Sequence, residues 1–126
     1  MTKFQALYQF FSSFGIPAYE ENAFYASDIV PDFPYITYNV ATSAFQDGEI
    51  TFNPSLWYRS TSWKEPEEKA SEISAVVGMG GVQIPCEDGY IWLKRGNPFY
   101  ISMGDESDKF IKRIYFNMTA EFLTKN

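Results

Sequence analysis

The sequence contains no histidine and only one cysteine among its 126 residues. Histidine is the usual general base near neutral pH and the commonest metal ligand. Its absence excludes Ser–His and Cys–His nucleophiles, histidine-ligated zinc and imidazole proton shuttles. A single cysteine cannot form an internal disulfide, which excludes a disulfide-stapled scaffold and favours a reducing compartment. We therefore expect the protein not to be an enzyme and to have no catalytic residues.

The chain also lacks an excess of positive charge and a long apolar run. Its acidic residues outnumber its basic ones, 16 to 10, which gives a formal net charge of −6. This balance argues against specific nucleic-acid binding and against adhesion to anionic membranes. No run approaches the roughly 20 apolar residues that span a bilayer. Gln5 and Gln9 interrupt the apolar N-terminus, and no cleavage site follows them, so we expect a soluble cytoplasmic protein.

Aromatic side chains are abundant, at 19% of the residues, and hydrophobic residues make up 45%. These fractions are typical of a folded globular chain rather than a disordered one. The length fits a single domain over residues 1–126 with one sizeable core.

Two segments have the periodicity of helices. The first has Thr2 as a candidate N-cap, Gly15 just past its end, and apolar residues at helical spacing: Phe4, Leu7, Tyr8, Phe11 and Phe14. This stripe indicates either a helix packed on its own sheet or a docking helix for a partner. The second has a capping box of Ser62 and Glu65, a stop at Gly78, and an apolar face of Ala70, Ile73, Val76 and Val77.

The remaining pattern predicts strands. Residues 35–42 and 50–59 read as a hairpin in which Pro54 marks an edge or a bulge. Residues 82–86 and 90–94 flank Asp88-Gly89, a strong hairpin signal, and a long final strand follows from about Arg113. These elements predict an α+β fold with a largely antiparallel, possibly mixed sheet of about four to five strands covered by two helices.

No motif points to a cofactor or a metal. Gly78, Gly80 and Gly81 follow a helix, whereas phosphate-binding glycine loops precede one. The acidic residues 105–108 lack the spaced oxygen ligands of an EF-hand loop, although weak calcium binding is conceivable there. We predict no cofactor, no metal site and no catalytic residue.

Two long segments, residues 22–34 and 96–108, read as irregular loops. Long loops in a compact domain are often functional, and aromatic residues are common anchors of protein interfaces. Such side chains also fold back over a core, and the sequence favours neither reading. The candidate subunit or partner interface consists of Phe24, Tyr25, Phe33, Phe99 and Tyr100.

Four stretches resemble a family of phage proteins encoded in prophages of Gram-positive gut bacteria. They are residues 55–63, 91–99, 103–105 and 117–123, which together run over most of the chain. The family comprises the tail-completion or tail-terminator proteins of long-tailed phages, which are also described as minor capsid or head–tail joining components.

The resemblance implies a structural virion assembly protein with a tail-terminator-like α+β fold. Such a protein self-associates into a ring, commonly a hexamer, at the head-proximal end of the tail tube. Its implied partners are the phage tail-tube protein and the head–tail connector proteins. It would lie in the host bacterial cytoplasm during assembly and then in the virion tail or neck. A ring needs two different patches on each subunit.

Two other hypotheses remain open at the level of sequence. The acidic charge also suits a small monomeric protein-binding module, such as an inhibitor that covers a host enzyme. A hydrolase that uses acidic residues alone has only the presence of carboxylates in its favour.

Overall fold

The structure is a computed structural model that describes residues 1–26, 31–39 and 41–126, with the backbone alone at residues 25 and 26. Its described residues are mostly β, with 43% in strands and 24% in helices. The helices are α1 (Lys3–Ser12), α2 (Glu21–Ala26) and α3 (Lys64–Val77). The strands are β1 (Ala18–Glu20), β2 (Tyr35–Tyr38), β3 (Glu49–Phe52), β4 (Ser55–Arg59), β5 (Val82–Cys86), β6 (Gly89–Gly104) and β7 (Ile111–Thr124).

The α+β prediction of four to five strands covered by two helices is wrong. The described chain forms one curled seven-stranded sheet, in the order β1-β2-β4-β7-β6-β5, with β3 also paired to β7. The sheet is mixed because β1 and β2 are parallel while the other pairs are antiparallel. Strand β1 has three residues, too few for an alternating pattern, and Asn53-Pro54 divides the expected return strand into β3 and β4.

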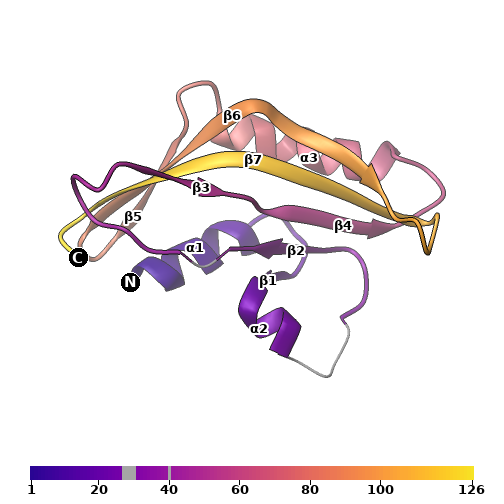
Figure 1. The fold of residues 1–126 in the computed structure, drawn as a ribbon, viewed down its shortest axis with the longest axis horizontal. Helices are drawn as coiled ribbons and strands as arrows, with labels where there is room; N and C mark the ends of the chain where they lie inside the picture. The colour runs from indigo at the N-terminus through magenta and orange to yellow at the C-terminus, as the bar shows by residue number, and fades with distance from the viewer. Residues whose placement is uncertain (27–30, 40) are drawn as a thin grey trace.

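Strand β7 is the centre of the sheet, and it was predicted correctly. One face of this strand is buried: Ile114, Phe116, Met118, Ala120 and Phe122. The backbone of β7 pairs with β6 along one edge and with β3 and β4 along the other (Figure 1). Each inward side chain alternates with a partly exposed polar or aromatic one, as expected for a strand with one face on the core.

Helices α1 and α3 complete that core. Ala6, Leu7 and Phe11 of α1 and Ala70, Ile73 and Val77 of α3 belong to the same buried cluster as the inward side chains of β7. The Thr2 cap is confirmed, because Thr2 and Gln5 form a reciprocal capping box. The Ser62 box is wrong: α3 begins at Lys64, and Ser62 Oγ accepts the Lys64 N–H at 3.0 Å.

The largest error concerns the second predicted loop. Residues 96–104 continue β6 into a 16-residue strand, although Gly96, Asn97 and Pro98 read as loop signals. A register shift between Arg95 and Tyr100 absorbs these residues as a bulge, after which pairing with β7 resumes. The hairpin of β5 and β6 around residues 87–88 was predicted correctly.

Candidate protein interaction surfaces

The structure places Phe24 and Phe33 in an aromatic cluster around Tyr35. The ring centroid of Tyr35 lies 5.2 Å from that of Phe24 and 5.2 Å from that of Phe33. Tyr19 of β1 joins the cluster, 6.1 Å from Phe24. Part of the first predicted loop is thus a helix, α2, and residues 27–30 lie outside the described residues. Tyr25 belongs to α2, and its side chain also lies outside the described part.

Phe99 and Tyr100 lie in β6 rather than in a loop. Phe99 is buried against Phe116, with ring centroids 5.3 Å apart, and the Arg95 guanidinium lies 4.1 Å from the Phe99 centroid. The Tyr100 hydroxyl donates to Glu67 of α3 at 3.1 Å. Burial and this hydrogen bond both raise the pKa of Tyr100. Phe99 thus packs within the sheet and Tyr100 bonds to α3, whereas Phe24 and Phe33 pack around Tyr35. The structure shows no contact between these two predicted aromatic groups among the described residues.

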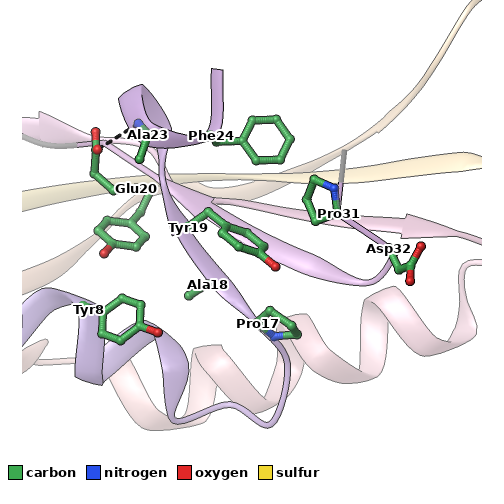
Figure 2. Close-up of a pocket in the computed structure, with 10 residues that line it drawn as sticks. Tyr8, Pro17, Ala18, Tyr19, Glu20, Ala23, Phe24, Pro31 and Asp32 are labelled. Atoms are coloured by element: carbon green, nitrogen blue, oxygen red, sulfur yellow. Dashed lines mark hydrogen bonds between the residues drawn. The ribbon is translucent and has the colours of Figure 1, made fainter. Parts of the chain in front are cut away.

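A groove of about 740 Å³ runs between α1, β1 and α2, and we call it the β1 groove (Figure 2). Tyr8 of α1 forms one wall, and Phe24 of α2 and Pro31 form the other, as Figure 2 shows. The remaining lining residues are Pro17, Ala18, Tyr19, Glu20, Ala23, Asp32 and Tyr38. Aromatic and proline side chains therefore dominate a concave surface that is large enough for several residues of a partner chain.

The floor of the β1 groove is a free strand edge. Among the described residues β1 pairs only with β2, and the Ile36 N–H donates to the Pro17 carbonyl at 2.9 Å. Because successive residues of a strand direct their backbone groups to opposite edges, those of Ala18 are directed away from β2, into the groove. Such an edge is a template for an added strand.

The charged side chains that the structure describes in the lining of the β1 groove are acidic. Among the described lining residues, Glu20 and Asp32 carry carboxyl groups and none is a lysine or arginine. The Glu20 carboxylate accepts the N–H groups of Asn22 and Ala23, at 2.7 and 2.9 Å, and so holds the start of α2. Burial, with the nearby Glu20 charge, raises the pKa of Tyr38 to about 12, so this phenol is neutral at physiological pH.

The apolar surface continues along α1. A smaller cavity of about 310 Å³ shares Glu20 and Tyr38 with the β1 groove and adds Phe4 and Leu7. Phe4 and Tyr8 are 50% and 53% exposed, one helical turn apart. The predicted aromatic stripe of α1 therefore divides: Leu7, Phe11 and Phe14 enter the core, while Phe4 and Tyr8 face solvent. In the sequence, the only sign of this exposed apolar surface was that the stripe has more aromatic residues than one buried helix face needs.

A second surface is the free edge of β6. Strand β5 pairs with β6 only as far as Leu93, and in the described chain no strand pairs with that side of residues 94–104. Residues 101–104 are all exposed, and Ile101 and Met103 are 48% and 41% exposed. Their cross-strand neighbours are Tyr115 and Arg113. This edge could not be predicted from the sequence, because residues 96–108 had the pattern of a loop.

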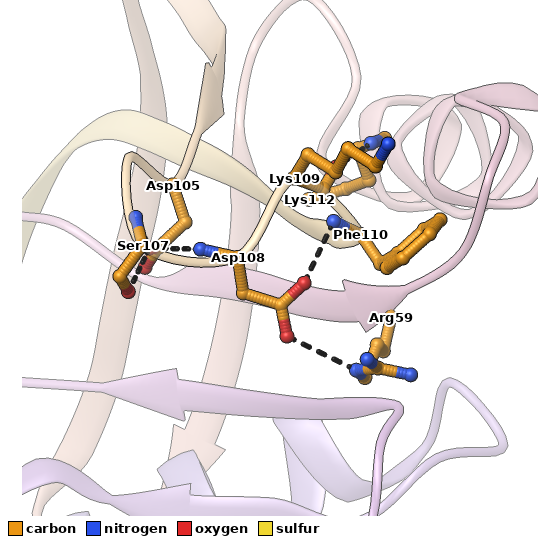
Figure 3. A network of polar contacts seen from close by, with 7 residues as sticks. All are labelled: Arg59, Asp105, Ser107, Asp108, Lys109, Phe110 and Lys112. Atoms are coloured by element: carbon orange, nitrogen blue, oxygen red, sulfur yellow. Dashed lines mark hydrogen bonds and ion pairs between the residues drawn. The ribbon is translucent and has the colours of Figure 1, made fainter.

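The acidic turn between β6 and β7 has an internal structural use (Figure 3). Asp105 Oδ1 accepts from the Ser107 hydroxyl at 2.6 Å, the Ser107 N–H at 2.8 Å and the Asp108 N–H at 3.1 Å. Asp108 accepts from the Phe110 N–H at 2.9 Å and from Arg59 Nε at 3.2 Å. The hydrogen bonds from Ser107 and Phe110, respectively, are the main reason why the pKa values of Asp105 and Asp108 are lowered. These carboxylates thus hold the turn together.

Within the described ranges, no three acidic or cysteine side chains gather in a way that would hold a metal ion. The helices that the structure describes are all too short or too polar to cross a membrane. Comparison with known proteins finds no protein-family model, no curated protein and no solved structure that matches this chain. Its function has to be inferred from its own residues.

Proposed function

We propose that the protein is a structural assembly protein of a long-tailed phage or prophage. In this proposal it self-associates into a ring at the head-proximal end of the tail tube, where it joins the tube to the head–tail connector. The main support for self-association is the free edge of β6, beside which Ile101 and Met103 are exposed. The resemblance of residues 55–63, 91–99, 103–105 and 117–123 to tail-completion proteins supplies the biological setting.

An exposed edge of this kind favours pairing with another chain. Its unpaired backbone N–H and C=O groups can bond to a second strand, and natural proteins usually block such edges with charges or cover them. Within the exposed residues 101–104, the two large side chains, Ile101 and Met103, are apolar rather than charged. Burying them supplies hydrophobic free energy in addition to the backbone hydrogen bonds.

A ring also requires a second, different surface on each subunit. Strand β3 offers one, because among the described residues it pairs only with β7. Its side chains Glu49 and Thr51 are exposed next to that edge. Pairing of the β6 edge of one subunit with the β3 edge of the next would continue the sheet from subunit to subunit.

The test is the absolute mass of the protein in solution, measured by light scattering during size exclusion over a wide concentration range. We expect a closed oligomer of the 14.5 kDa chain, with a hexamer as the mass that the resemblance implies. Met103→Lys places a charge beside the β6 edge and should weaken association by about tenfold or more, the equivalent of roughly 1.4 kcal/mol.

Met79→Lys is the matched control, because Met79 is 91% exposed and lies outside β6. It introduces the same charge and should leave the mass unchanged. A wild-type chain that stays monomeric at every concentration would contradict self-association and favour the monomeric binding module. An oligomer that Met103→Lys does not weaken would show that another surface forms the interface.

A further inference from the structure

We infer that the β1 groove binds an extended, positively charged segment of another protein, which adds to the free edge of β1 as an extra strand. This inference concerns a surface other than the β6 edge and does not depend on the ring. It names the chemistry of the partner: a lysine- or arginine-bearing peptide in β conformation.

The first step is the backbone. The groove contains the free edge of β1, and the backbone groups of Ala18 are directed into it, away from the β1–β2 pair that the Pro17 carbonyl helps to form. Main-chain hydrogen bonds to such an edge provide affinity for an extended peptide regardless of its sequence. Ala18 itself is small and buried, so its side chain does not obstruct an added strand.

The second step is the set of side chains on the two sides of that edge. Side chains alternate across a strand, so an added strand directs every second residue toward α1 and the others toward the opposite side. Ala18 and Glu20 pair with the buried residues Ile36 and Tyr38, which places them on the α1 side with Tyr8. Tyr19 pairs with Thr37 on the other side, toward Phe24 and the aromatic cluster.

The third step is charge. Glu20 and Asp32 each contribute a carboxylate to the groove, whose lining also includes the rings of Tyr8 and Tyr38. The Glu20 carboxylate is turned toward Ala23 of α2 (Figure 2). A cation over an aromatic face is attracted to the ring quadrupole, and a carboxylate beside it adds to that attraction. Since the described lining of the groove has no lysine or arginine to compete, the side chains that suit the α1 side are lysine and arginine. Apolar side chains suit the opposite, aromatic side.

The probe that follows is a short peptide, acetyl-Lys-Val-Lys-Val-Lys-amide, titrated into the isotope-labelled protein and followed by NMR. We expect shift changes at Ala18, Tyr19, Glu20 and Tyr8, and binding that weakens as salt is added. The acetyl-Glu-Val-Glu-Val-Glu-amide peptide tests charge and should not bind. A version of the lysine peptide with methylated backbone nitrogens tests strand addition and should also fail to bind.

Tyr8→Ala tests the wall of the groove, because Tyr8 is exposed and its loss should leave the fold intact. We expect peptide binding to weaken about three- to thirtyfold, the range for one cation–π contact. Tyr90→Ala is the matched control: Tyr90 is 49% exposed, against 53% for Tyr8, and lies outside the groove lining. It should leave peptide affinity unchanged.

Three results would overturn the inference. If the acidic peptide bound as tightly as the basic one, charge would not determine binding. Equal binding of the methylated peptide would remove strand addition. Shifts at the groove that grow with protein concentration before any peptide is added would show that a second copy occupies it. Each of these is distinct from failure of the proposed ring, which is measured by mass and by Met103→Lys.

Discussion

At the scale of single residues, the first helix shows how similar side chains serve two purposes. Phe11 is 1% exposed and stacks on Tyr38 and Phe52, with ring centroids 4.9 and 5.9 Å away. Phe4, less than two turns earlier, is half exposed beside the smaller cavity. One ring therefore contributes mainly to folding, and the other is available to a partner.

This difference predicts opposite effects for the same substitution. Phe11→Ala should lower the free energy of unfolding by about 3–5 kcal/mol, because it removes a fully buried ring and leaves a cavity. Phe4→Ala should change it by only about 0.5 kcal/mol, as for other exposed sites. Urea unfolding of both variants measures the contrast. Comparable losses in the two would mean that Phe4 packs into the core.

At the scale of elements, the turn between β6 and β7 depends on ionised carboxylates. The folded-state pKa values of Asp105 and Asp108 lie below the usual value near 3.8. Their ionised forms therefore stabilise the turn above about pH 3.8, and this stabilisation is lost as the pH falls through the lower folded-state pKa values. Acid should loosen this turn.

Ser107→Ala tests the cause of the Asp105 shift. The Ser107 hydroxyl is the largest contributor, so its removal should raise the pKa of Asp105 toward the usual value, while the backbone N–H groups keep part of the shift. NMR titration of the carboxyl carbons measures the change. Asp108 serves as the internal control, since its main hydrogen bond comes from the Phe110 N–H and should keep its pKa low. An Asp105 midpoint that does not move would contradict this assignment.

The elements also differ in how far the sequence predicts them. Strand β7 was predictable because ten residues of strict alternation have no other explanation, and α1 was predictable from Thr2 and its apolar spacing. Strand β6 was not, because Pro98 and its neighbours mark a loop unless a bulge places them within a strand. Strand β1 is set by tertiary pairing with β2 and carries no local signal.

The candidate surfaces were harder to predict than the elements. The predicted docking residues included Phe99 and Tyr100. Both lie in strand β6 instead of a loop, and their rings pack against the rest of the protein. Tyr8 and Glu20 come together only because α1 packs beside β1, and twelve positions separate them in the chain. A groove formed in this way depends on the fold and leaves no contiguous motif.

At the scale of the whole molecule, pairing and burial lead us to expect the sheet to be most stable at its centre and least stable at its free edges. Among the described residues, strand β7 pairs with three strands and contributes five side chains to the core, whereas β1 has three residues and one strand partner. The N- and C-terminal regions meet at one end, where Lys3 bonds to Asn126, and the β6–β7 turn lies at the other (Figure 1). The free edges of β6 and β1 are therefore separate from the stable centre.

Hydrogen exchange should reproduce this arrangement and test the proposed assembly independently of mass. At low protein concentration we expect the slowest exchange in the centre of β7 and fast exchange for edge amides of β1 and of residues 101–104. If subunits pair through the β6 edge, protection at residues 101–104 should rise with protein concentration, because a second strand then bonds to those amides. Met103→Lys should abolish the rise, and Met79→Lys should not. Concentration-dependent protection that appears at β1 and leaves residues 101–104 unchanged would move the self-association to the groove and contradict both proposals.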